Sequence, residues 1–177
     1  ASVEVTGGLP REGAAGRLGI FYEDQNGPRR NAGSETDIYD AGLSFDLGVA
    51  DLLLQATRYE QKLDGNRLRG VPTDDLGNFL ADRRWNHNEP TDFLDLESNV
   101  LQAKLYAEPI EGLTLDAGVR YMDGTEQQKY HEPSGLFDSD GDGLVDSSRR
   151  QFRDQYRRNE GVSFGTNAVW SKRFGAI

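Results

Sequence analysis

The sequence contains no cysteine, only one methionine and two histidines. Without cysteine, the chain has no disulfide, no thiolate metal site and no thiol nucleophile. No run of 18 or more apolar residues is present, which excludes a transmembrane helix. Basic residues are also the minority, with 20 Lys and Arg against 30 Asp and Glu. The resulting net charge of −10 argues against a nucleic-acid partner, which would require a basic surface.

Glycine is abundant, at 21 of 177 residues, and it follows no collagen-like period, which indicates many turns. The length fits one domain. The first residues already alternate like a strand, the last ones stop without a polar tail, and no signal peptide is visible. We therefore expect the chain to be a piece of a longer protein, the alternative being a processed or trimmed chain.

Period-two alternation dominates the sequence, and helical spacing is nearly absent. In the clearest segment, 113–121, Leu, Leu, Ala, Val and Tyr occupy one face, and Thr, Asp, Gly and Arg occupy the other. The facing of one further strand stays open, because Leu52, Leu53 and Leu54 are consecutive. The pattern predicts seven strands, most of them about ten residues long: 2–6, 17–23, 39–45, 51–62, 101–107, 113–121 and 162–171.

The predicted connections alternate between short and long. In an up-and-down sheet, all short turns then lie on one rim and all long loops on the other. The short ones are Gly7–Gly13, Asp46–Ala50 and Glu108–Gly112, with Lys172–Gly175 as the next. The long ones are Gln25–Glu35, Asp64–Thr91 and Gly124–Glu160. A compact soluble domain rarely carries such long loops, whereas a membrane β-barrel has short periplasmic turns and long extracellular loops.

Aromatic residues lie near the ends of the apolar faces. Tyr22 and Tyr121 would lie at the outer rim, and Phe45 and Trp170 near the inner rim, as in the aromatic girdles of barrels. Strand-end aromatics also occur in soluble sandwiches, and alternation alone cannot separate the two architectures. The expected fold is an all-β antiparallel meander that forms an open part of a large transmembrane barrel and not a closed barrel.

Several segments resemble the N-terminal part of the barrel of TonB-dependent siderophore receptors. GGLPREGAAGRLGIFYEDQNGPRRN resembles their first barrel hairpin, and LRGVPTDDLGNFLADRRWNHNEPTDFLDLESNVLQAKL resembles a long loop and its returning strand. KYHEPSGLFDSDGDGLVDSSRRQFRDQYRRNE resembles a loop of one subset of the family. The strand GLTLDAGVRYMDG is common to many outer-membrane barrels and is less specific.

The resemblance implies a partial barrel domain over residues 1–177 in the outer membrane of a Gram-negative bacterium. It implies uptake of a ferric siderophore or similar chelate, driven by the TonB complex, with a plug domain inside the barrel. The plug, its TonB-contacting segment and the remaining strands are absent from the sequence. The implied partners are outer-membrane lipid and lipopolysaccharide, the siderophore or other small-molecule chelate and, in the full-length protein, the TonB complex and the plug.

Three other interpretations remain open. The chain could belong to a porin-like barrel without plug or TonB partner, or to a soluble calcium-binding β-sandwich used in adhesion or carbohydrate binding. A secreted hydrolase is the third, but no G-x-S-x-G, Walker or dinucleotide-binding glycine pattern is present, and we expect no enzyme. The two histidines lack metal-ligand spacing, so zinc is not expected.

The segment 138–146 is the sharpest local motif. Carboxylates at alternate positions and a glycine at the tight turn resemble a calcium loop of the EF type. Arg149 stands at the twelfth position, where such loops have glutamate, and no helices flank the segment. The alternative is an acidic surface turn. The candidate calcium ligands are Asp138, Asp140, Asp142, the carbonyl of Leu144, and Asp146.

Basic and aromatic residues in the long loops are candidate ligand contacts, because loops carry function more often than scaffolds do. An arginine run near residue 150 could bind anionic chelates or lipopolysaccharide phosphates, but local pairing with Asp146, Asp154 and Glu160 is favoured. The same two interpretations apply to Arg29, Arg30, Arg83 and Arg84. The run is Arg149, Arg150, Arg153, Arg157 and Arg158. The candidate ligand-binding residues are Arg83, Arg84, Trp85, His87, Tyr130 and His131.

Overall fold

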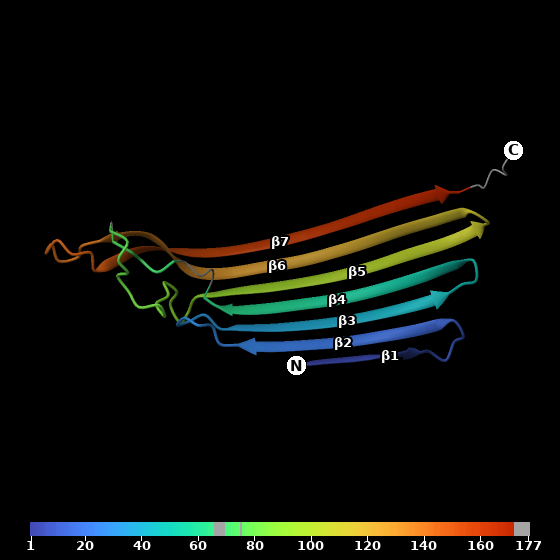
Figure 1. Cartoon of the computed structure of the whole chain (residues 1–177), viewed down its shortest axis with the longest axis horizontal. Coiled ribbons are helices and arrows are strands. Elements are labelled where there is room, and N and C mark those ends of the chain that lie inside the picture. Colours follow the sequence, from blue (N-terminus) through green and yellow to red (C-terminus); the bar gives the residue numbers. More distant parts are fainter. Residues whose placement is uncertain (66–69, 75, 172–177) are drawn as a thin grey trace.

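The computed structural model describes residues 1–65, 70–74 and 76–171, and within them the chain is all-β (Figure 1). The seven strands are β1 (Ser2–Gly8), β2 (Ala14–Gln25), β3 (Ser34–Asp46), β4 (Ala50–Asp64), β5 (Phe93–Ile110), β6 (Leu113–Phe137) and β7 (Ser147–Trp170). No helix in this part of the chain is long and apolar enough to cross a membrane.

All seven strands form one antiparallel sheet in the order of the sequence, from β1 to β7. Figure 1 shows an open, gently curved meander in which β1 and β7 are the two free edges. The predicted open meander is therefore confirmed. The described residues form no second packed sheet, so the sandwich is not the architecture found.

The strand register separates an apolar from a polar face. Because successive side chains point to opposite sides, residues paired across strands share one face. Leu54 pairs with Leu43 and Ala103, whereas Leu53 pairs with Ser44 and Lys104. The ambiguous leucine triplet is thus resolved, with Leu54 on the apolar face and Leu53 on the polar face.

The apolar face ends abruptly on β4 to β7. Beyond the last apolar row, the next row on the same face is polar or charged on these strands, whereas Ile20 and Tyr39 continue the row on β2 and β3. The last apolar row is Leu18, Ala41, Ala56, Leu101, Tyr121 and Val162, and the following row is Ile20, Tyr39, Arg58, Asn99, Asp123 and Glu160. On β6 the apolar stretch from Leu113 to Tyr121 rises about 27 Å, or about 20 Å in height for a tilt near 40°. This approaches the apolar band of about 25 Å that membrane barrels present to lipid.

Little apolar surface is buried within the described residues. The buried hydrophobic residues are Ala14 and Leu94. On β7, by contrast, Phe164 and Trp170 are 86% and 70% exposed. A sheet with a continuous exposed apolar band requires another apolar phase or partner to cover it.

The two longest strands correct the prediction for the third long loop. The segment Gly124–Glu160 was expected to be a loop, but β6 has 25 residues and β7 has 24. Their pairing continues from Leu113–Trp170 to Phe137–Ser147, with one bulge near Pro133. The apolar alternation ends near Tyr121, but the backbone ladder does not. The loop itself is only 138–146.

The predicted asymmetry of the two rims is confirmed. The turns 9–13, 47–49 and 111–112 lie at one end of the strands, and the loops 26–33, 65–92 and 138–146 lie at the other end (Figure 1). The predicted turn Lys172–Gly175 lies outside the described residues. The β6–β7 hairpin projects beyond the other strands on the long-loop side.

Candidate functional site at the long-loop rim

Hydrogen bonds join the described part of loop 65–92 to loop 26–33. The Arg30 amide donates to the Arg84 carbonyl at 3.0 Å. The Asn86 side-chain amide donates to the carbonyls of Arg30 and Asn31 at 2.8 and 3.0 Å, and the Asn31 side chain donates to the Asn88 carbonyl at 3.0 Å. Asparagine suits such loops because its side chain pairs readily with backbone groups.

Asp92 fixes the other end of loop 65–92 to β6. Its side chain is 1% exposed, and one oxygen lies 2.8 Å from His131 Nδ1. The other oxygen accepts the amides of Glu89 and His131, both at 3.0 Å. Burial raises the pKa of the Asp92 carboxyl, but these hydrogen bonds outweigh burial and the net pKa is lowered. The carboxylate is therefore the charged anchor of the loop.

Arg150 of β7 supplies a second attachment. It forms an ion pair with Glu89 and donates a hydrogen bond to the His87 carbonyl at 2.9 Å. The loop thus spans from loop 26–33 to the β6–β7 hairpin. This arrangement gives the longest connection fixed contacts at the long-loop rim.

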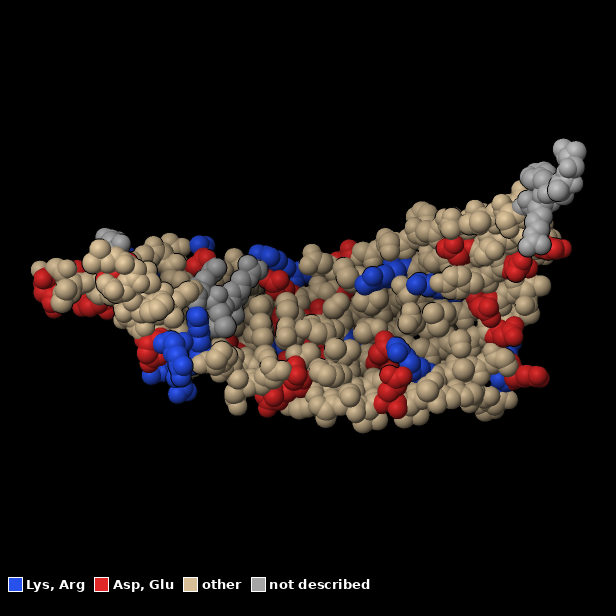
Figure 2. All heavy atoms as spheres, in the orientation of Figure 1, with Lys and Arg blue, Asp and Glu red and all other residues tan. Residues whose placement is uncertain are grey.

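The joined loops bring four arginines together. Arg29 and Arg30 come from loop 26–33, and Arg83 and Arg84 come from loop 65–92, where the backbones of Arg30 and Arg84 are hydrogen-bonded. Asp82 partly balances them, with an oxygen 3.7 Å from Arg30. Figure 2 shows basic side chains gathered at the long-loop end of the molecule. Exposed guanidinium groups, such as those of Arg30, Arg83 and Arg84, are suited to binding an anion with several oxygen atoms.

The candidate ligand residues do not form one continuous site. Arg83 and Arg84 are exposed, and Trp85 is half-buried with its ring 6.5 Å from that of His87. His87 is only 2% exposed, so its ring is not presented to solvent. Tyr130 and His131 are consecutive on β6 and point to opposite faces of the hairpin. His131 is engaged by Asp92 and lies 5.3 Å from the ring of Phe152.

The arginine run of β7 is largely neutralised by neighbouring carboxylates. Arg153 pairs with Glu132 at 3.2 Å, Arg157 with Glu126 at 3.8 Å, and Arg158 with Asp123 at 2.9 Å. Local pairing is thus found, as favoured, but mostly with β6. Of the three expected partners, Glu160 lies 3.9 Å from Arg158, whereas Asp154 pairs with Lys129 and Asp146 bonds to Ser139.

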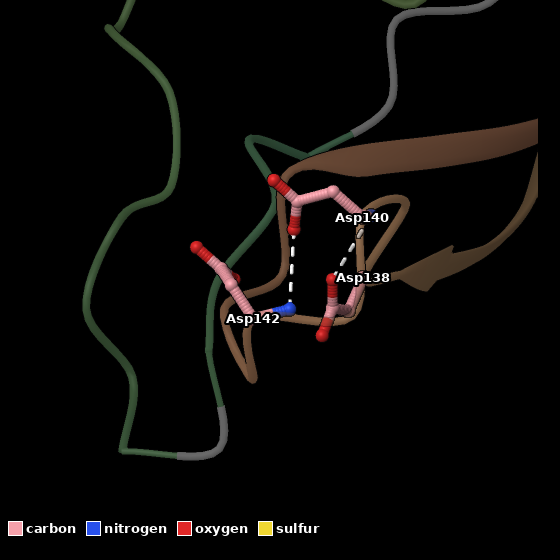
Figure 3. Close-up of side chains that lie close together, drawn as sticks. All are labelled: Asp138, Asp140 and Asp142. Atoms are coloured by element: carbon pink, nitrogen blue, oxygen red, sulfur yellow. Dashed lines mark hydrogen bonds between the residues drawn. The ribbon is translucent and has the colours of Figure 1, made fainter.

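The acidic loop 138–146 folds around Asp138 (Figure 3). The Asp138 carboxylate accepts the amides of Asp140, Gly141 and Gly143 at 3.2, 2.7 and 2.7 Å. These bonds, led by that from Gly143, lower the pKa of Asp138. Gly141 and Gly143 have φ of 82° and 88°, a region that favours glycine. Oxygens of Asp138, Asp140 and Asp142 lie within 4.8 Å of one another.

The other two candidate calcium ligands are arranged differently. The Asp146 carboxylate accepts the Ser139 hydroxyl at 2.6 Å and the Ser139 amide at 2.9 Å, which lower its pKa in that order of importance. The Leu144 amide donates a hydrogen bond to the Asp142 carboxylate at 2.8 Å, and the residue is 69% exposed. Arg149 lies with its guanidinium 5.0 Å from the Phe137 ring centre. The loop therefore brings together the carboxylates of Asp138, Asp140 and Asp142, whereas the Asp146 carboxylate binds Ser139 at the start of the loop.

The structure adds positioning residues that the sequence pattern did not single out. Asp92 and Glu89 hold the loop system, together with Arg150 of the predicted arginine run, and Asn86 and Asn31 join its two parts. Apart from Arg150, none belongs to a motif noted in the sequence. The sequence offered only a weak signal: an acid directly before a strand and asparagines clustered in a long loop.

Comparisons with known proteins identify the fold. No protein-family model matches the chain, and no curated protein matches it in sequence. Among solved structures, the chain is similar to the ferric-catecholate import receptor Fiu of Escherichia coli K12 in its open form, with a TM-score of 0.82 and 13% sequence identity. The match covers 99% of this chain and 29% of the Fiu chain. The chain thus has the fold of part of that receptor.

Proposed function

We propose that this chain is part of the barrel wall of an outer-membrane, TonB-dependent receptor that imports a ferric siderophore or similar chelate. The observation that carries the proposal is the two-faced, seven-strand meander with short turns on one rim and long loops on the other. Such a sheet is suited to a barrel with lipid outside and a polar interior. The fold likeness to an import receptor over 99% of the chain supports it.

The apolar face would contact outer-membrane lipid of a Gram-negative bacterium. Its band height approaches that of membrane barrels, and the polar and charged row that borders it on β4 to β7 suits the edge of a lipid bilayer. The charged long-loop rim would face outward and meet lipopolysaccharide. A porin-like barrel would share these properties, so the import of a specific chelate requires separate support.

The polar face would line the interior. Arg17 forms an ion pair with Asp40, whose other oxygen accepts the Thr57 hydroxyl at 2.8 Å, and Gln102 donates to Gln55 at 2.8 Å. Such a hydrogen-bonded polar surface suits contact with a plug domain and water. The plug and the TonB contact would belong to other parts of the full-length protein.

The arginine cluster of loops 26–33 and 65–92 would receive the chelate. Ferric chelates with oxygen donors are commonly anionic, and guanidinium groups bind such oxygens with charge-assisted hydrogen bonds. Trp85 lies beside Arg84 and offers an aromatic face. We therefore expect Arg83, Arg84 and Trp85 to contact the chelate directly. The other predicted ligand residues, His87, Tyr130 and His131, would support the loops that carry this site.

Chelate uptake by the full-length protein tests this function. Cells expressing it in place of their own receptors would accumulate radiolabelled ferric catecholate, and dissipating the proton gradient would stop uptake. We expect Arg83→Gln with Arg84→Gln to weaken chelate binding at least tenfold. Arg11→Gln, at the opposite rim beside Phe45, is the matched control. Energy-independent passage of many small solutes would instead identify a porin.

We also propose that loop 138–146 binds calcium weakly. The support is the spacing of the acids and the grouping of Asp138, Asp140 and Asp142, which offer hard oxygen ligands of the kind calcium takes. The ion would order the tip of the β6–β7 hairpin and would have no catalytic role. Other oxygens, from Leu144, Asp146 or water, would complete its shell.

Calorimetric titration of the full-length protein tests calcium binding. A dissociation constant of about 0.1–1 mM is expected, as in extracellular calcium modules. Asp140→Asn with Asp142→Asn should abolish the binding heat, whereas Asp154→Asn, outside the loop, should leave it unchanged. If the double variant binds calcium as the parent does, the loop is an acidic turn only.

A further inference from the structure

Five apolar side chains form a patch on the mostly polar face of the sheet. Phe21, Ile38 and Tyr59 pair in one row across β2, β3 and β4. Val100 pairs with Met122 one row further toward the short turns, and Val100 lies diagonally beside Tyr59, within reach of an aromatic ring. Met122 is 38% exposed, and the other four are half-buried. These five residues form the inner patch.

The inner patch lies where the opposite face changes from apolar to charged. Tyr59 is next to Arg58, the first charged residue beyond the apolar band on β4, and Met122 is next to Asp123, the corresponding residue on β6. Facing alternates along a strand, so at this level charged side chains point to one side of the sheet and apolar ones to the other. Lipid would contact the face of the apolar band, so the inner patch requires a cover from the opposite, interior side.

Hydrogen-bonded polar side chains lie on both sides of the inner patch along the strands. On the short-turn side, Gln102 donates to Gln55 at 2.8 Å, and on the long-loop side Gln61 donates to Thr36 at 3.3 Å. On β5 the apolar surface continues to Leu96. An apolar centre that contains Phe, Tyr and Met beside a polar rim has the composition of a protein–protein interface.

Arg120 adds a cation to the short-turn border of the inner patch. It precedes Met122 by two positions and therefore shares its face, and it is exposed. Its direct cross-strand partners are Gln102 and Ser163, which are uncharged. Within the described residues Arg120 forms no ion pair, whereas three other arginines of this face do.

The remaining charged residues of the polar face do not neutralise Arg120. Lys104 lies diagonally beside it, and the carboxylates of Asp51 and Asp116 lie on the far side of Lys104. Asp116 is four residues from Arg120 on β6, or about 13 Å along the strand. The others are either paired or at least three strands away: Arg17–Asp40, Arg153–Glu132 and Arg157–Glu126 are paired, and Glu4, Glu23 and Asp46 lie on β1, β2 and β3. A partner surface with a carboxylate therefore complements this border.

We propose that the inner patch is a docking surface for the plug domain of the full-length protein, and that the plug contributes an apolar surface with a carboxylate opposite Arg120. The match to Fiu covers 29% of that chain, so a receptor of that size has most of its length outside this sheet and can supply such a partner. The inference rests on the proposed function, because it requires the polar face to line a barrel. It goes beyond that function by assigning the contact to named residues and by stating the chemistry of the plug surface.

Photo-cross-linking in the full-length protein tests the contact. A benzophenone amino acid replaces Tyr59 or Met122 in turn, outer-membrane fractions are irradiated, and the linked peptides are identified by mass spectrometry. We expect both positions to link to a plug peptide. Val119, on the apolar face of β6, is the matched control and should link to no plug peptide. Links from Tyr59 and Met122 to loop peptides only, or to no peptide, overturn the proposal.

Variants then test the chemistry of the contact by amide hydrogen exchange in the linked plug peptide. Met122→Asp should accelerate exchange at least about tenfold, because a charge replaces an apolar contact. Arg120→Gln should accelerate it about fivefold, and Arg120→Lys should restore the parent rate. Val169→Asp, on the same face at the short-turn end of β7, is the matched control and should leave the rate unchanged. Parent rates in both Met122→Asp and Arg120→Gln overturn the assignment.

The outcomes separate this inference from the proposed function. A protein that fractionates with the outer membrane and imports chelate, yet gives no plug link from Tyr59 or Met122, contradicts the docking surface alone. Links from these two positions to lipid would place the polar face in the membrane and contradict the proposed function itself.

Discussion

At the scale of single residues, Asp92 makes more contacts that hold the long loop than any of the residues predicted as ligand contacts. It is buried, negatively charged and bonded to two backbone amides and one imidazole. Because its folded-state pKa is lowered, its contribution is present above the ordinary aspartate pKa and is lost as the pH falls through the lowered value. The attachment that it provides should therefore hold from neutral pH to about pH 4, weaken as the pH falls further, and be lost once the pH passes the lowered pKa of Asp92.

Asp92→Asn should release loop 65–92 at neutral pH. Asparagine keeps the shape but loses the charge-assisted hydrogen bonds, each worth about 1.5–3 kcal/mol. Amide hydrogen exchange at Glu89 and His131 should accelerate about ten- to a hundredfold. Asp24→Asn, at an exposed position on β2, is the control. Unchanged exchange in Asp92→Asn would mean that the carboxylate does not anchor the loop.

Gly65 is required where loop 65–92 leaves β4. Its φ is 77°, and a Cβ there would overlap the Asn88 side chain, with Asn88 Cβ at 2.9 Å. Asn88 is only 4% exposed and has little room to move. Gly65→Ala should therefore accelerate amide exchange across 86–92, since it adds a clash to a backbone cost of about 1 kcal/mol.

Gly48→Ala is a matched comparison for that substitution. Gly48 has a similar φ of 88°, but a Cβ there would meet no atom within 4 Å, and it lies at the short-turn rim. It should leave exchange in 86–92 unchanged. Equal exchange in the two variants would contradict the described packing of Gly65 against Asn88.

At the scale of elements, β4 offers the sharpest test of the two faces. Leu53 and Leu54 are neighbours with opposite surroundings, since Leu53 pairs with Lys104 and Leu54 with Ala103. Leu54→Glu would place a charge on the lipid side at a cost of about 1–3 kcal/mol, whereas Leu53→Glu would face Lys104. Urea titration of the full-length protein in lipid vesicles should show a loss for Leu54→Glu only. The reverse order would invert the assigned faces.

The sequence was sufficient to predict the seven strands, their meander and the rim asymmetry, because apolar and polar residues alternate in most of the predicted strands. It was insufficient for the ends of β6 and β7. Beyond Tyr121 these strands carry polar side chains on both faces, and no apolar period remains to mark them. The two strands continue because their backbone groups form hydrogen bonds with each other. Ion pairs between β6 and β7, such as Arg158–Asp123, add to this pairing.

The candidate site was less accessible to sequence reasoning. Arg83 and Arg84 were selected by type and loop position, and the structure places them beside loop 26–33. His131 was selected as a ligand contact, but it holds Asp92 across a separation of 39 residues. Such pairings depend on how a long loop folds back, and no local period encodes that.

At the scale of the whole molecule, the central claim is that the apolar face lies in lipid and the polar face lines a wet interior. A soluble interpretation would require the apolar band to be covered by protein. The two arrangements predict different environments for alternate residues of the same strand. The absence of cysteine from the chain makes single-cysteine labelling of each position straightforward.

The most direct measurement is therefore spin-label accessibility along β6 in the full-length protein, reconstituted in membranes. Labels at Leu115, Ala117 and Val119 should collide readily with oxygen, which concentrates in lipid. Labels at Asp116 and Gly118 should respond to a water-soluble relaxation agent. A period of two between the reagents is the result that the account predicts. Protection of Leu115, Ala117 and Val119 from both reagents, as in a dry protein core, would contradict it.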